Sequence, residues 1–268
     1  MPDASPHTTT PSPGLFAVLA SGSRGNAFYV GTRDRGVLVE AGLCAAEIER
    51  RLARLGLSMW AVEAVLLTHE HGDHVHGLRG LLRTAVRPIH VYASRGTLAA
   101  LAPAVADRGR PLVAGQRQRV AGLDVRPCAV PHDAREPLAY RIDGAGWSVG
   151  FITDLGRTTR PLVAAMQGVS LLYLEANHDP AMLADGPYPP FLKERIRGGR
   201  GHASNLEAAR FVVSLGLFVP RRIVLGHLSS HNNRPELARA AMERVVSERS
   251  CALEMATQDE PQMMQLAP

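Results

Sequence analysis

Short apolar runs of strand length recur along the chain, and many are followed closely by Gly, His or Asp. Between some of the runs, apolar residues repeat at the three- and four-residue spacing of one helical face. The runs predict strands at 15–20, 37–39, 62–67, 89–92, 123–130, 147–152, 171–174 and 223–225. The helical spacing predicts helices at 43–55, 205–215 and 235–246. This pattern predicts a mixed α/β fold in which helices pack on sheets.

The chain contains no internal repeat and no long linker rich in Pro, Gly or charge in its middle. We therefore expect a single domain over residues 14–256. Residues 1–13 are rich in Pro, Thr and Ser and lack the basic and apolar segments of an export signal, so we expect a flexible tail there. Residues 257–268 are polar and rich in Met, and we expect them to form a C-terminal tail.

The composition is that of an ordinary globular protein, with 46% hydrophobic and 21% charged residues among 268. Collagen-like, disordered and disulfide-scaffold classes are thereby excluded. The three cysteines form neither a zinc knuckle nor a disulfide framework, which favours a reducing, cytoplasmic location. No apolar run approaches the roughly 18 residues of a membrane span, so we expect no membrane association. The net charge of +5 is compatible with a polyanionic substrate but does not by itself argue for one.

A cluster of histidines follows the apolar run at 62–67, in the sequence His69-Glu70-His71-Gly72-Asp73-His74. Histidines two residues apart cannot share a helical face, so the pattern favours a loop in which the glycine allows a sharp turn. Three imidazoles and a carboxylate in six residues are a ligand set for zinc, iron or manganese. The alternative is a solvated polar loop, which would place four ligand-type residues directly after a buried strand by coincidence.

The pattern H-x-H-x-D-H after an apolar strand resembles the metallo-β-lactamase superfamily. That resemblance implies an α/β fold of four layers, an αβ/βα sandwich with two mixed β-sheets flanked by helices. It also implies two divalent metal ions, zinc first and manganese or iron as alternatives. Further ligand types occur in the expected order just past later apolar runs, at His132, Asp154 and His227. Taken singly, these could be a turn histidine, a strand-end cap and a buried histidine.

The resemblance implies a role for each of these side chains. One metal would be held by His69, His71 and His132. The second would be held by Asp73, His74 and His227, with Asp154 bridging the two. A departure from the family pattern is Glu40, which stands where many relatives have an Asp that orients a ligand.

Four further motifs narrow the resemblance to the WalJ/YycJ-type branch of the superfamily. They lie at 21–26, 174–179, 201–205 and 226–229. For this branch the resemblance implies a 5′-3′ DNA exonuclease, with DNA as substrate and a metal-bridging hydroxide as nucleophile. The same layout is similar to tRNA 3′-processing endonucleases and to a cyclic phosphodiesterase of phosphonate metabolism. The alternatives are a carbon-ester or thioester hydrolase of the lactonase or glyoxalase II kind, and a non-catalytic carrier like those of pyrroloquinoline-quinone biosynthesis.

The residues around His202 favour phosphate chemistry. Ser204 and Glu207 form an S-x-x-E capping box, which predicts that a helix begins at Ser204. The N–H groups at such a helix start attract anions, and His202 lies two residues before it. We therefore expect His202 to be catalytic. In the two-metal mechanism that the resemblance implies, we expect Asp73 to be catalytic as well, by orienting the hydroxide. The alternative for His202 is a surface loop histidine beside an ordinary cap.

Substrate contacts are expected at four positions: Ser204, Asn205, His178 and Arg24. Three other arginines are candidates for phosphate contacts, although the pattern slightly favours a solvated charged surface. They are Arg195, Arg197 and Arg200.

Overall fold

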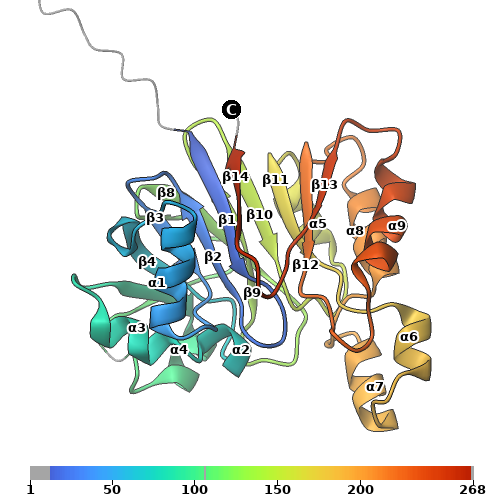
Figure 1. The fold of residues 1–268 in the computed structure, drawn as a ribbon, viewed down its shortest axis with the longest axis horizontal. Helices are drawn as coiled ribbons and strands as arrows, with labels where there is room; N and C mark the ends of the chain where they lie inside the picture. The colour runs from blue at the N-terminus through green and yellow to red at the C-terminus, as the bar shows by residue number, and fades with distance from the viewer. Residues whose placement is uncertain (1–12, 106, 267–268) are drawn as a thin grey trace, which may run out of the picture.

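The computed structural model describes residues 13–105 and 107–266, so the expected tail at 1–13 lies almost entirely outside the described residues (Figure 1). The described strands form two mixed seven-stranded sheets. The first sheet has the order β14 (Gln262–Leu266), β1 (Gly14–Ala20), β2 (Ala27–Gly31), β3 (Gly36–Val39), β4 (Val62–Leu66), β5 (His90–Ser94) and β6 (Gly109–Leu112). The second has the order β13 (Ala252–Met255), β12 (Arg222–Gly226), β11 (Leu171–Glu175), β10 (Ser148–Ile152), β9 (Leu138–Asp143), β8 (Leu123–Ala129) and β7 (Gln118–Val120).

Helices cover the outer face of each sheet. The first sheet packs on α1 (Ala45–Arg54), α3 (Leu78–Thr84) and α4 (Arg95–Leu101). The second packs on α5 (Arg160–Met166), α8 (Asn205–Ser214) and α9 (Pro235–Val246). The four layers confirm the predicted αβ/βα sandwich. The short elements α2 (Gly72–Val75), the 3-10 turn Met59–Ala61, α6 (Pro180–Asp185) and α7 (Pro190–Arg197) lie in the connections.

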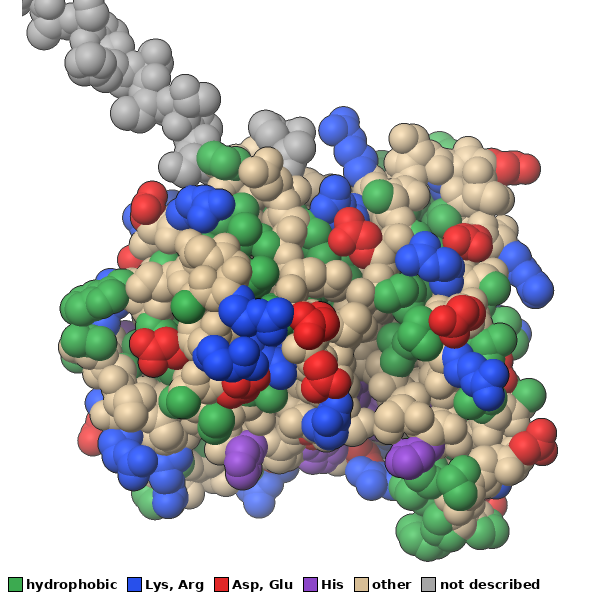
Figure 2. Space-filling view, in the orientation of Figure 1, with side chains coloured by type: hydrophobic (Ala, Val, Ile, Leu, Met, Phe, Trp, Pro, Cys, Tyr) green, Lys and Arg blue, Asp and Glu red, His purple; other side chains and the backbone are tan. Residues whose placement is uncertain are grey.

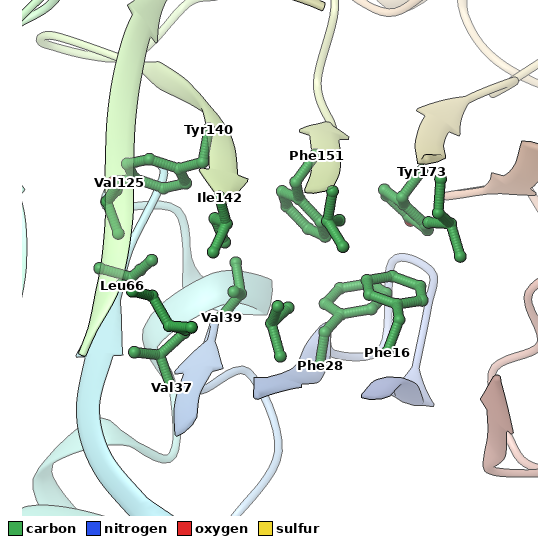
Figure 3. Close-up of a cluster of buried hydrophobic side chains, with 14 of the residues drawn as sticks. Phe16, Phe28, Val37, Val39, Leu66, Val125, Tyr140, Ile142, Phe151 and Tyr173 are labelled. Atoms are coloured by element: carbon green, nitrogen blue, oxygen red, sulfur yellow. The ribbon is translucent and has the colours of Figure 1, made fainter. Parts of the chain in front are cut away.

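The two sheets face each other across a dry core of aromatic and branched side chains (Figure 3). Phe28 of the first sheet meets Phe151 and Tyr173 of the second edge-on, with ring centroids 4.8 and 4.7 Å apart. Edge-to-face contacts of this kind add to the stabilisation that burial provides. This core fixes the two sheets relative to each other, and therefore the loops at their shared edge.

Each predicted run and helix-period stretch coincides with a strand or helix, but the C-terminal stretch differs from the expectation of a tail. Residues 262–266 form β14, which pairs antiparallel with β1. Met264 and Leu266 are buried between the sheets, whereas Gln265 between them is exposed. This alternation is the period of a half-buried strand, and the polar residues of the segment conceal it. Within the described residues, no helix combines the length and apolar character that crossing a membrane requires.

The strand β14 predicts a measurable stability difference between neighbouring substitutions. Met264→Ala should lower the free energy of unfolding by about 2–3 kcal/mol, because it removes buried apolar volume. Gln265→Ala should change it by less than about 0.5 kcal/mol, because that side chain faces solvent. Urea unfolding followed by circular dichroism measures both. Equal midpoints for the two variants would show that residues 262–266 are not part of the folded sheet.

Candidate metal centre

The candidate site lies where several strands end at one edge of the sandwich. Among the described residues, four non-glycine residues have a positive φ. Three of them lie just past strand ends at this edge: Glu40, Asp154 and His227, with φ of 65°, 50° and 53°. The fourth, Ala121, lies in the turn between β7 and β8. Each such conformation costs about 1–3 kcal/mol and persists only where its surroundings enforce it. The backbone is therefore bent at the ends of β3, β10 and β12 in a way that turns these side chains into one place.

Three histidines converge at this edge from two loops. His69 and His71 follow β4, and His132 follows β8. Nε2 of His69 lies 3.0 Å from Nδ1 of His71, which lies 3.3 Å from Nε2 of His132. Together the three offer ligand atoms within 4.8 Å of one another, as a metal site requires. The structure thus brings together the three residues that the resemblance assigned to one metal.

A second group lies beside the first. Asp73, His74 and His227 also offer ligand atoms within 4.8 Å of one another. Asp154 reaches both groups, because its Oδ2 lies 3.2 Å from Nε2 of His74 and its Oδ1 lies 3.7 Å from Nε2 of His132. All seven ligand-type residues predicted from the sequence are therefore adjacent at one site.

Hydrogen bonds on the far side of the rings decide which nitrogen of each imidazole is free. Nδ1 of His132 lies 3.0 Å from the carbonyl oxygen of Gly201, which can only accept, so Nδ1 donates and Nε2 of the neutral ring carries the lone pair. That Nε2 lies 3.2 Å from Oδ1 of Asp133, a buried oxygen with no hydrogen bond. Two acceptors facing each other at this distance are stabilised by a nearby cation. Arg195 pairs with Oδ2 of Asp133, but Oδ1 still lacks a hydrogen-bond donor. The donor set therefore fits borderline divalent metal ions, and the buried clusters are consistent with a dinuclear site.

A buried glutamate that the sequence reasoning missed organises the other side of the site. Oε1 of Glu175, at the end of β11, accepts hydrogen bonds from Nδ1 of His202 and Nδ1 of His227, both at 2.8 Å. Its Oε2 accepts from the backbone N–H of Leu155 at 2.7 Å and of Ala203 at 3.0 Å. With four donors on its two oxygens, Glu175 positions its neighbours rather than offering a ligand atom. The sequence signals for Glu175 are its place in the motif at 174–179, which by itself assigns it no role, and its position directly after the apolar run 171–174.

The electrostatics of the site follow from this packing. Burial lowers the pKa of His69 and of His132, which keeps both imidazoles neutral and able to bind a metal. Burial alone would raise the pKa of Asp154, but His227 and His74 lower it well below its ordinary value. Burial would likewise raise the pKa of Glu175, and the opposing effect of His202 brings it down to about 2. The two acids are thus held ionised in the interior by the surrounding imidazoles.

Glu40, the departure from the family pattern, is fully buried under His74. Its Oε1 accepts from the backbone N–H of Thr68 at 3.1 Å, and its Oε2 lies 3.5 Å from Nδ1 of His74. Burial raises the pKa of Glu40, while His74 opposes the rise. The longer side chain therefore occupies the place of a ligand-orienting carboxylate behind His74.

The helix start predicted at Ser204 is confirmed. Ser204 is the N-cap of α8 and forms both halves of the capping box with Glu207. His202 lies before this helix start and lines a pocket of about 430 Å³ together with His71, Asp73, Asp154 and His227. The structure therefore places His202 in the same cavity as the candidate metal ligands.

The expected substrate contacts lie elsewhere than in the pocket lining. Ser204 is occupied by its cap, and Asn205 exchanges two hydrogen bonds of 2.9 Å with Asn233. His178 is buried and does not line the pocket either. These three residues could therefore act on a substrate only by positioning residues that do line it. Arg24 lines a neighbouring pocket and pairs with Asp259 at 2.7 Å.

The chain is similar to known proteins along most of its length. A sequence profile described as a Beta-lactamase superfamily domain matches residues 35–228. The chain is 35% identical over 238 residues to Exodeoxyribonuclease YycJ of Bacillus anthracis, covering 87% of this chain and 89% of that protein. It is 33% identical over 233 residues to Exodeoxyribonuclease WalJ of Streptococcus pneumoniae, covering 85% and 86%. Among solved structures, the metallo-β-lactamase fold protein YhfI of Bacillus subtilis gives a TM-score of 0.72 at 16% identity, covering 94% of this chain and 100% of that one.

If Glu175 organises the site, replacing its carboxylate by an amide of the same size should destabilise the protein. Glu175→Gln should lower the free energy of unfolding by about 3 kcal/mol, because an amide nitrogen would face N–H donors in the interior. The matched control is Glu254→Gln on β13, where a partly exposed pair with Arg222 at 3.2 Å contributes little, so a change under about 0.5 kcal/mol is expected. Chemical unfolding measures both, and equal stabilities would remove Glu175 from its organising role.

Proposed function

The chain belongs to the metallo-β-lactamase superfamily, and on that premise we propose that it is a dinuclear metal-dependent phosphodiesterase that degrades DNA as a 5′-3′ exonuclease. The observation that carries the proposal is the clustering of all seven ligand-type side chains beside a pocket that four of them line together with His202. The two exodeoxyribonuclease relatives support DNA as the substrate, because the similarity extends over most of both chains. The 5′-3′ direction of cleavage is a further element of the proposal, which the names of these relatives do not specify.

We assign the ligands by the two groups of side chains. His69, His71 and His132 would hold one ion, and Asp73, His74 and His227 would hold the other. Asp154 would bridge them, since it approaches members of both groups. Nitrogen and carboxylate ligands of this kind suit zinc, and they also accept manganese or iron. Bound there, such ions would lower the pKa of water and offset the charge of a phosphodiester.

His202 has the position of a proton donor to the substrate. Its Nδ1 donates to Glu175 at 2.8 Å, which fixes the ring and leaves Nε2 as the nitrogen available to a substrate. Burial opposes protonation of His202, but the neighbouring Glu175 raises its pKa above the ordinary value, so Nε2 carries a proton more readily. From that atom a proton can pass to the departing oxygen or be shared with a phosphoryl oxygen.

Asp73 has a complementary place on the pocket lining. Its Oδ2 lies 3.4 Å from Nε2 of His227 and 3.3 Å from Nε2 of His74, and its side chain borders the cavity. The pKa of Asp73 is lowered, since hydrogen bonds from His227 and His74 outweigh the opposing effect of burial. An ionised Asp73 would accept a hydrogen bond from the attacking water and orient it toward the phosphorus. No side-chain nucleophile is required.

The direct test is cleavage of end-labelled DNA by the purified protein. We expect immediate release of a 5′ label and stepwise shortening of a 3′-labelled strand. Both should be abolished by chelation and restored by added zinc or manganese, because the proposed chemistry depends on bound ions. Single- and double-stranded substrates labelled at either end separate exonuclease from endonuclease cleavage. Metal-dependent turnover of thioesters without any phosphodiester cleavage would refute the proposal and favour the glyoxalase II-like alternative.

A second test separates His202 from the metal ligands. His202→Ala should retain bound metal but lose about 10²–10⁴-fold in the rate of phosphodiester cleavage, the usual contribution of a positioned proton donor. His90→Ala is the matched control, because His90 lies at the start of β5, the end away from the ligand loops, and does not line the pocket. Metal analysis and cleavage of DNA are measured on the same samples. Loss of metal in proportion to activity would make His202 a ligand instead.

A further inference from the structure

The pocket has two sides of different chemistry. One side carries the candidate metal ligands, and the other carries Tyr188, Leu192 and Ile196 from the segment around α7. Figure 1 shows α2, which bears Asp73 and His74, and α7 on different sides of the strand ends. Phosphate chemistry does not need the apolar side. A substrate that reaches the ligands must nevertheless lie against it.

The helix α7 is not part of the folded core. None of its eight residues is buried, and Phe191 in its first turn is 72% exposed. In Figure 2 the lobe in which Figure 1 places α6 and α7 ends in a patch of hydrophobic side chains beside a recess. Packing of the sandwich therefore does not explain why this helix carries large apolar residues.

Two polar contacts hold α7 in place beside the pocket. Nζ of Lys193 donates to the carbonyl oxygen of Ala184 at the end of α6, 2.6 Å away. Nε of Arg195 donates to Oδ2 of Asp133, the residue after His132. Phe191 lies one helical turn before Arg195, which lines the pocket, and on the same stripe of the helix, although Phe191 itself lies outside the lining. These two contacts thus fix the position of α7, although no other part of the described chain buries its apolar side chains.

The charge of the segment indicates what could cover them. Lys193, Arg195 and Arg197 outnumber Glu194 within α7, and Arg200 follows shortly after. Basic residues interleaved with exposed aromatic rings are the composition that binds single-stranded nucleic acids, with bases stacking on the rings and cations meeting phosphates. Tyr188 is suited to such a contact because its ring is braced edge-on by His231, with centroids 5.8 Å apart.

We propose that residues 180–197, the α6–α7 arm, bind the nucleobases of single-stranded DNA. Tyr188 contacts the nucleotide at the cleaved bond, and Phe191 stacks on a base farther along the strand. This inference rests on the proposed function for the choice of DNA as substrate. It adds that the protein recognises the nucleobases of that substrate. The bases on the arm would hold the strand while its phosphate lies at the ligand cluster.

Binding of nuclease-resistant strands tests the arm independently of cleavage. The probes are a fluorescein-labelled phosphorothioate decathymidylate and an abasic phosphorothioate strand of the same length, with affinity read by fluorescence anisotropy. We expect the wild type to bind the thymidine strand more tightly than the abasic one. Phe191→Ser should weaken binding of the thymidine strand about tenfold, leave the abasic strand unaffected, and be rescued by Phe191→Trp, because stacking needs a ring.

The matched control is Phe218→Ser. Phe218 is 55% exposed and lies between α8 and the start of β12, at the opposite end of that strand from His227. Its replacement should leave both affinities unchanged, and thermal unfolding should show that both serine variants remain folded. Equal loss of binding in the two serine variants would mean that the exposed rings are merely adhesive and would overturn the proposal.

The outcomes distinguish this inference from the proposed function. Equal affinity of the wild type for thymidine and abasic strands, or unchanged binding by Phe191→Ser, overturns the arm even if the protein cleaves DNA. Base-dependent binding that Phe191→Ser abolishes supports the arm even if the protein cleaves no phosphodiester, a result that would refute only the nuclease assignment.

Discussion

One buried carboxylate holds the geometry of the site together. Glu175 accepts four hydrogen bonds, from the rings of His202 and His227 and from the backbones of Leu155 and Ala203. Those four donors belong to three chain segments far apart in sequence, which follow β10, precede α8 and follow β12. A buried carboxylate with fewer partners would be costly, so each segment stabilises the positions of the others. The position of Asp154 between the two groups of candidate ligands depends on the same contact, because Asp154 is next to Leu155.

Gathering these buried ionisable groups also strains the backbone at the strand ends. Asp154 and His227 adopt a left-handed backbone because the strands that carry them are fixed by the inter-sheet core. The hydroxyl of Ser21 accepts from the N–H of His227 at 2.8 Å and contacts the Tyr173 hydroxyl at 2.8 Å. Two successive hydrogen bonds thus connect the hydroxyl of Tyr173, in the core, to the backbone of His227, a candidate ligand. Rigid sheets and strained strand ends together hold the candidate ligands in one arrangement.

The sequence predicted the parts of this arrangement that are local. The spacing of His69, His71, Asp73 and His74 is a signal in itself, and so is the capping box at Ser204. Glu175 gave no such signal, because its role exists only through partners 20 to 52 residues away. The strand β14 was missed for a similar reason: the alternation of Met264 and Leu266 acquires meaning only beside the free edge of β1. Motifs contained within a few residues could therefore be predicted from the sequence, whereas roles that depend on contacts between distant segments could be found only in the structure.

The position of α7 separates substrate selection from stability. The sandwich must keep its core and its strand ends to fold at all, and the candidate ligands are inseparable from those ends. The helix α7 buries no residue, so changes on its surface cost the fold little. Arg195 nevertheless connects it to Asp133, whose other oxygen lies 3.2 Å from Nε2 of His132. A chain built this way can alter what it holds at the pocket mouth while the chemistry beneath stays constant, which is how one fold can serve many substrates.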